Sequence, residues 1–190
     1  MVRILKATLF ISLSILASCN NGPEISSVEL PLLSGESLPV LDRSSKASVY
    51  VFMAPDCPLC INYSLVVREL EDEFSDQDVA VNLVFPGTSY SQDTIEVFLN
   101  RHKLNSTVYL DPEFQLVHLL NVKVTPEAVL VNDKGETQYR GAIDDWVYGT
   151  GLRKQQISRR YLRDAIIKVL NGHEPDTAYV RAYGCYIELI

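Results

Sequence analysis

Residues 47–60 read ASVYVFMAPDCPLC, and this stretch decides the fold. Its first eight residues are mostly apolar and rich in β-branched and aromatic side chains, which is typical of a central strand covered on both faces. It ends in two cysteines three positions apart, and apolar residues then recur at helical spacing through residue 74. The sequence therefore predicts that Cys57 and Cys60 lie where a buried strand turns into a helix.

The remaining segments first alternate between strand and helix patterns and then form a hairpin. We expect, in order, a strand at 79–85, a helix at about 92–103, a strand at 107–110, a helix opened by Pro112, paired strands at 128–131 and 137–140, and a helix at 158–170. A parallel βαβ half thus meets an antiparallel ββα half. This order predicts an α/β fold with a central mixed β-sheet flanked by helices.

The first 18 residues have the pattern of a secretory signal peptide. Arg3 and Lys6 precede an apolar run, residues 7–17, that is too short to span a bilayer comfortably. The run ends in Leu-Ala-Ser before Cys19, which resembles the bacterial lipobox, where the cysteine thiol receives a diacylglyceryl group. The resemblance implies a lipid-anchored protein of the cell envelope, facing the periplasm or the cell exterior. The alternatives are an ordinary signal peptide with Cys19 incidental, or an uncleaved anchor.

Length and composition fit one domain after such a segment is removed. The chain has 190 residues, 47% of them apolar, and a net charge of −7, which disfavours binding to nucleic acid. We expect a signal peptide at 1–18, a polar lipid-anchored tether at 19–29, one domain at 30–172, and a tail at 173–190 that packs on the domain.

The paired cysteines of an exported protein have several possible uses. A haem attachment motif needs a histidine next, but position 61 is Ile61. A structural zinc site needs four ligands, and the chain has no second CxxC motif and only three scattered histidines. A purely structural bridge across three positions closes too small a loop to stabilise much. The motif therefore favours a redox dithiol without a metal or cofactor.

Placement at a helix start predicts the role of each cysteine. Pro58 at the first helical position puts Cys57 at the helix N-terminus, where free backbone N–H groups stabilise a thiolate and lower its pKa. We expect Cys57 to attack a partner disulfide and Cys60, one turn on, to resolve the mixed disulfide. The predicted function is an exported, membrane-anchored thiol-disulfide oxidoreductase that acts on protein thiols and disulfides and has an upstream redox partner.

Several of these features together resemble a known family. The strand, the CPLC helix start and the sequence Val-Thr-Pro-Glu at 124–127 before a hairpin are similar to the thioredoxin fold, specifically its redoxin and thioredoxin-like branch. The match covers about residues 30–190 and includes the terminal Gly-Cys-Tyr-Ile at 184–187. The resemblance implies that Pro126 is a cis-proline facing the CxxC motif and that Thr125 pairs with a bound polypeptide. Val51 replaces the buried acid of thioredoxin.

Two alternative functions belong to the same fold. Peroxiredoxins place a threonine or serine three residues before the reactive cysteine, whereas this chain has Ala54 there. Copper-delivery proteins of this fold use a CxxxC motif with a distant histidine, and the spacing here is CxxC. A thiol-dependent peroxidase and a copper-binding metallochaperone therefore stay as alternatives.

Cys185 is the cysteine left over by these assignments. An odd cysteine in an exported protein is buried and inert, paired between chains, or part of the site. Its small and apolar flanks favour burial, but the proteins that the chain resembles also end in Gly-Cys, and Gly184 allows close approach of the backbone to another surface. We expect the tail to fold back and bring Cys185 near the CxxC motif as an auxiliary thiol.

Overall fold

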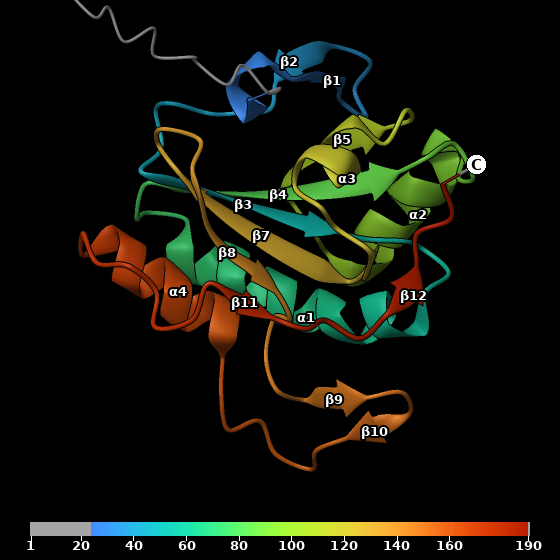
Figure 1. Ribbon diagram of the computed structural model, residues 1–190. Helices are drawn as coiled ribbons and strands as arrows, with labels where there is room; N and C mark the ends of the chain where they lie inside the picture. Colours follow the sequence, from blue (N-terminus) through green and yellow to red (C-terminus); the bar gives the residue numbers. More distant parts are fainter. Residues whose placement is uncertain (1–23, 190) are drawn as a thin grey trace, which may run out of the picture.

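A computed structural model describes residues 24–189, and Figure 1 shows its layers. The expected signal peptide and Cys19 lie outside the described residues. A short 3-10 turn, Ile25–Ser27, comes first. The elements that follow are β1 (Glu29–Pro31), β2 (Ser37–Pro39), β3 (Ala47–Phe52), α1 (Pro58–Phe74), β4 (Val79–Pro86), α2 (Gln92–His102), β5 (Thr107–Asp111), α3 (Gln115–Leu119), β6 (Val124–Thr125), β7 (Glu127–Asn132), β8 (Thr137–Gly141), β9 (Val147–Gly149), β10 (Leu152–Arg153), α4 (Tyr161–Leu170), β11 (Tyr179–Val180) and β12 (Cys185–Tyr186).

The main sheet has six strands in the order β11-β8-β7-β3-β4-β5. β3 runs parallel to β4 and antiparallel to β7, so the sheet is mixed. All six residues of β3 are buried, because both faces of this central strand are covered, as its mostly apolar sequence predicts. The predicted α/β fold with a central mixed sheet is confirmed.

The two faces of the sheet carry separate hydrophobic cores. Val49 and Val51 of β3 face the core formed with α1, α2 and α4, while Tyr50 and Phe52 face the opposite one. The second core is closed by α3 and by the segment before β3, which includes the β1–β2 hairpin. In Figure 1 these two layers lie on either side of the sheet. The end of β3 is thereby held rigidly from both sides.

The N-terminal part of the domain starts earlier than the sequence analysis expected. Ile25 and Val28 are buried in the second core, although both belong to the segment 19–29 expected to be a tether. The tail is also more regular than its sequence suggests, since β11 joins the main sheet parallel to β8. The segment before β1 and the tail that contains β11 are therefore both packed parts of the domain.

Two helices begin three residues later than predicted. The Oδ2 atom of Asp111 accepts hydrogen bonds from the N–H groups of Leu116 and Val117, both at 3.0 Å, so that this buried carboxylate organises the start of α3. Ser158 donates from its backbone N–H to Asp145 at 2.9 Å and stays outside α4.

Within residues 24–189, the helices are too short or too polar to cross a membrane.

Candidate redox site

Cys57 occupies the N-cap position of α1, as predicted from the strand-to-helix pattern. Pro58 is the first residue of the helix, and the Ile61 N–H donates to the Cys57 carbonyl oxygen at 3.0 Å. The turn from β3 is closed by the Cys57 N–H, which donates to the Ala54 carbonyl at 3.2 Å. Cys57 therefore lies at the positive end of the α1 dipole, although its sulfur accepts no hydrogen bond from the helix N–H groups in this disulfide-bonded form.

The disulfide of this structure differs from the expected pair. Cys57 is bonded to Cys185, 128 positions away, and Cys60 is a buried free thiol. The Cα atoms of the bonded pair are 6.2 Å apart, within the usual range for a disulfide. The tail thus folds back onto the CxxC motif, in agreement with the position expected for Cys185. Its role as an auxiliary thiol stays a prediction.

Cys60 lies in an apolar site beneath Cys57. Its side chain is fully buried, and its sulfur accepts a hydrogen bond from the Ala54 N–H at 3.4 Å. Burial raises the pKa of this thiol to about 12, and the charge of Asp56 acts in the same direction, against hydrogen bonds from Ala54 and Thr125. Cys60 is therefore overwhelmingly protonated near neutral pH.

The segment that faces Cys57 is the loop from β6 to β7. The Thr125–Pro126 peptide bond is cis, as the resemblance implied. The Thr125 carbonyl oxygen lies 3.2 Å from the Cys57 sulfur, and the Thr125 side chain is buried. The structure thus brings four of the predicted site residues, Cys57, Cys60, Thr125 and Pro126, to one end of the sheet. It does not test their roles.

A buried carboxylate next to this loop was missed by the sequence analysis. Glu127 is only 3% exposed, and its Oε2 atom accepts hydrogen bonds from the N–H groups of Lys123, at 2.9 Å, and Val124, at 3.4 Å. Its other carboxylate oxygen lies 3.7 Å from the Arg140 Nε atom. Glu127 therefore fixes the β6 backbone beside Thr125. The only signal in the sequence is an acid next to the apolar run 128–131.

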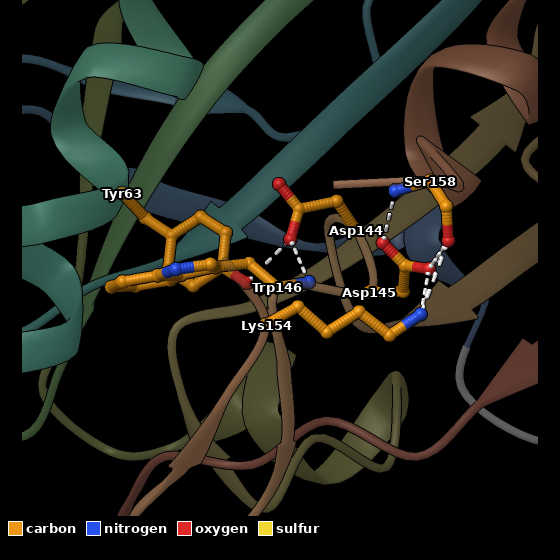
Figure 2. A network of polar contacts seen from close by, with 6 residues as sticks. All are labelled: Tyr63, Asp144, Asp145, Trp146, Lys154 and Ser158. Carbon is orange, nitrogen blue, oxygen red and sulfur yellow. Dashed lines mark hydrogen bonds and ion pairs between the residues drawn. The ribbon is translucent and has the colours of Figure 1, made fainter. Parts of the chain in front are cut away.

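A second polar network ties α1 to the loop after β8 (Figure 2). The Tyr63 hydroxyl, one turn after Cys60, donates to Asp144 at 2.7 Å, and the Trp146 N–H donates to the same oxygen at 2.9 Å. The rings of Tyr63 and Trp146 meet edge to face at 5.5 Å. Because burial raises the pKa of the Asp144 carboxyl, these two donors are its main compensation.

The neighbouring carboxylate, Asp145, holds the hairpin β9–β10. Lys154 forms an ion pair with it, and Ser158 donates to it from both the hydroxyl and the backbone N–H (Figure 2). Burial alone would raise the pKa of Asp145, but these donors outweigh it and hold the pKa well below the usual range. The hairpin is thereby fixed next to the site.

This hairpin forms one wall of a groove that opens beside the disulfide. The groove has a volume of about 630 Å³ and includes Pro58, Leu59 and Cys185 in its lining. Its charged lining residues are four cations, Lys123, Arg140, Arg153 and Arg181, and the single buried acid Glu127. A surface of net positive charge thus adjoins the disulfide of a chain whose net charge is −7.

Aromatic rings orient the cations of the groove. Arg153 stacks over Trp146 at 5.1 Å, and Arg140 stacks over Tyr179 at 4.8 Å. Such stacking restricts the guanidinium groups without neutralising them. A second pocket, of about 440 Å³, also borders Cys185 and is lined by Cys57 and Asp56, among others. The Tyr90 hydroxyl donates a hydrogen bond to Asp56 there.

Comparisons with known proteins agree with this geometry. The family model described as Redoxin matches residues 20–145. A curated relative, the thiol-disulfide oxidoreductase ResA of Halalkalibacterium halodurans, is 23% identical over 104 residues. That match covers 55% of this chain and 58% of the relative, so the chain spans little more than half the length of the curated protein.

Solved structures share the fold at low sequence identity. A hypothetical protein from Sinorhizobium meliloti is 19% identical, with a TM-score of 0.76 over 86% of this chain and 91% of that one. A secreted disulfide oxidoreductase of Mycobacterium tuberculosis, described as homologous to E. coli DsbE, is also 19% identical. Its TM-score is 0.53, over 61% of this chain and 84% of that one. These likenesses establish the thioredoxin-like fold.

Proposed function

Because the chain belongs to the redoxin family, we propose that it is a thiol-disulfide oxidoreductase that exchanges disulfides through Cys57. The observation that carries this proposal is the position of Cys57 at the N-terminus of α1, bonded to one cysteine and adjacent in the motif to a second, buried thiol. The name of the curated relative is consistent with it. A cysteine in this environment exchanges disulfides because its thiolate is stabilised.

The reaction that these residues support has two exchange steps. The Cys57 thiolate attacks one sulfur of a partner disulfide, and the other partner sulfur leaves as a thiolate that takes up a proton. Cys60 then loses its proton and attacks the Cys57 sulfur, so that the partner leaves as a dithiol and a Cys57–Cys60 disulfide forms. The sequence runs in reverse when the partner is oxidised. Every step exchanges one disulfide for another, so no further cofactor is needed.

The β6 edge supports a role in binding the partner chain. The backbone of Thr125 lies next to the Cys57 sulfur, and Glu127 holds β6 in place from within. We assign to Thr125 the pairing with an extended partner backbone and to Pro126 the presentation of that edge. Backbone pairing of this kind tolerates many side chains, which suits a protein that acts on several protein disulfides.

The groove beside the disulfide favours a partner with acidic residues near its cysteine. Lys123 and Arg153 line this groove and make no ion pair among residues 24–189. The net acidic chain repels acidic proteins elsewhere on its surface, so the local positive charge orients such a partner toward Cys57.

We further propose that the protein is exported and tethered to a membrane through Cys19, with its redox site outside the cytoplasm. The support is the signal-peptide pattern and the lipobox-like sequence before Cys19. The change Cys19→Ala should release the protein from membranes and block its lipid-dependent processing. Unchanged membrane association and processing in this variant would contradict the anchor.

The test of the enzymatic proposal is disulfide exchange with a model peptide disulfide under a thiol reductant. We expect turnover by the wild type and none above background by Cys57→Ser, while the double variant Cys60→Ser/Cys185→Ser, which lacks both thiols able to displace the peptide, should accumulate a mixed disulfide between Cys57 and the peptide. Turnover by Cys57→Ser equal to that of the wild type would contradict the proposal. Faster turnover with hydrogen peroxide than with the peptide would favour a peroxidase, and tight copper binding that needs both motif cysteines would favour a metallochaperone.

A further inference from the structure

The C-terminal segment occupies the edge that a partner polypeptide would need. β12 pairs antiparallel with β6, and Cys185 lies opposite Thr125 while Tyr186 lies opposite Val124. The pairing extends by one more bond, from the Ile187 N–H to the Lys123 carbonyl at 3.1 Å. Figure 1 shows the red C-terminal segment running from β11 to β12 at this end of the molecule. An external strand cannot use the same backbone groups while β12 is present.

Gly184 allows this pairing to be as close as it is. A Cβ atom at this position would lie 2.2 Å from the Thr125 carbonyl oxygen and 2.7 Å from the Thr125 carbonyl carbon. Both atoms belong to backbone that Glu127 and the β6–β7 loop hold in place, so neither can move away cheaply. Glycine is therefore required here for contact with β6, whatever the conformation of its own backbone.

The arrangement has the features of a captured substrate. An extended segment pairs with β6, and its cysteine forms a disulfide with Cys57. We propose that residues 184–187 are an internal substrate, which competes with external polypeptides for β6 and for Cys57 and is released when Cys60 takes over the disulfide. This inference rests on the proposed function, because it assigns a regulation to the same redox site.

The release step is an internal disulfide exchange. Cys60 loses its proton and attacks the Cys57 sulfur, the Cys57–Cys185 bond breaks, and Cys185 leaves as a thiolate that takes up a proton. One disulfide is broken and one is formed, so the step needs neither oxidant nor reductant. It places the disulfide between Cys57 and Cys60 and frees the Cys185 thiol together with β12.

Besides the disulfide, the segment is held, among residues 24–189, only by its short backbone pairing with β6 and by the partly buried side chains of Cys185 and Ile187. The Tyr186 side chain is 78% exposed, and β12 contributes only two residues of pairing. Upstream, β11 is fixed by its parallel pairing with β8, so only residues 181–184 connect a fixed strand to Cys185. A thiol on such a short tether has an effective concentration on the order of millimolar toward Cys57. An external partner must therefore outcompete a strong internal one.

The first test maps the disulfide of the oxidised full-length protein. Free thiols are alkylated under acidic denaturing conditions, and the digest is analysed by mass spectrometry. We expect Cys57–Cys185 linked and Cys60 alkylated in the resting protein. A resting protein with Cys57–Cys60 linked and Cys185 alkylated would overturn the inference, although it would leave the proposed exchange activity intact.

The second test measures competition in the Cys60→Ser background, where the internal transfer is blocked. A reduced cysteine peptide at about 0.1 mM is added to the oxidised protein, and the mixed disulfide at Cys57 is quantified after acid quench. Against an internal thiol of about 1 mM effective concentration, the tail should win roughly ten to one. Gly184→Ala, which disturbs β12 without altering any thiol, should raise the yield of mixed disulfide at least about fivefold.

Matched variants distinguish a failure of the internal-substrate inference from a failure of the proposed function. Tyr186→Phe in the same background removes only the phenolic hydroxyl of an exposed side chain in β12 and should behave as its parent. Equal yields in Gly184→Ala and its parent would overturn the internal-substrate inference. If Gly184→Ala does not fold, Cys185→Ser in the same background is reduced and given the peptide as its disulfide dimer. Its mixed disulfide at Cys57 should then persist, whereas in the Cys60→Ser parent Cys185 should attack Cys57 and release the peptide thiol. Failure of reduced Cys185→Ser to form any mixed disulfide with a peptide disulfide would instead refute the proposed function.

Discussion

The transfer of the disulfide from Cys185 to Cys60 should depend steeply on pH. Only a thiolate attacks a disulfide, and burial raises the pKa of Cys60 to about 12. At pH 8 about one Cys60 in 10⁴ is then ionised, whereas an ordinary cysteine with a pKa near 8.5 is about one quarter ionised. We expect the transfer rate to rise about tenfold per pH unit from pH 8 to pH 11.

The groups around Cys60 determine whether a substitution raises or lowers the pKa of this thiol. The Asp56 carboxylate raises the pKa of Cys60, and this carboxylate accepts a hydrogen bond from the Tyr90 hydroxyl. The Thr125 hydroxyl and the Ala54 N–H lower that pKa. Asp56→Asn should therefore speed the transfer at pH 8, and Thr125→Val should slow it, while both variants keep the tenfold dependence per pH unit.

The assay starts from the oxidised full-length protein. After a jump to each pH, samples are quenched in acid and alkylated, and the fractions with Cys57–Cys185 and Cys57–Cys60 bonds are measured by mass spectrometry. Circular dichroism at each pH excludes unfolding as the cause of a faster rate. A rate that levels off by pH 9 would show that Cys60 ionises like an ordinary thiol, and would refute the reasoning from its burial.

Three further predictions concern the surroundings of the site. Tyr63→Phe removes one of the two donors to buried Asp144 and should lower the free energy of unfolding by about 1–2 kcal/mol, measured by urea titration. Asp145→Asn should also destabilise the protein near neutral pH. Because the folded-state pKa of Asp145 is depressed, its stabilisation is present above the unfolded value near 3.9 and is lost as the pH falls through the folded value, so the difference between wild type and variant should shrink in acid. Arg153→Glu should slow capture of an acid-flanked peptide several-fold at low salt, whereas Arg159→Glu, outside the groove, should not; equal effects of the two changes would remove the groove from substrate selection.

The fold was predictable because its central elements carry strong local patterns. The mostly apolar run of β3 and the helical spacing of apolar residues after Cys60 reflect burial, which such patterns in the sequence indicate directly. The starts of α3 and α4 were not predictable from such patterns. They depend on Asp111 and Asp145, whose carboxylates accept backbone hydrogen bonds across several residues and take the preceding residues out of the helix.

The site was predictable only where its residues are close in the sequence or belong to a recognised motif. The CxxC spacing placed Cys57 at a helix start, and the resemblance to the thioredoxin fold placed Pro126 opposite it. The bond from Cys57 to Cys185 depends on the pairing of β12 with β6, which joins segments about 60 residues apart. The terminal Gly-Cys predicted that Cys185 comes near the CxxC motif, but strands of two residues have no periodicity, so nothing local in the sequence predicts the pairing or the bond itself.

The two cysteines that compete for Cys57 differ in the element that carries them as well as in their burial. Cys60 lies on the first turn of a 17-residue helix and is fully buried, so its reaction waits for a rare thiolate in a fixed position. Cys185 is half-buried on a two-residue strand that four residues connect to β11. The exchange with Cys185 is therefore expected to be fast and reversible, while the exchange with Cys60 is slow and displaces the occupant of β6. Because of this difference, the attack by Cys60 is the step that decides whether the tail or an external partner occupies β6. This explains why a buried, protonated thiol is useful at this position.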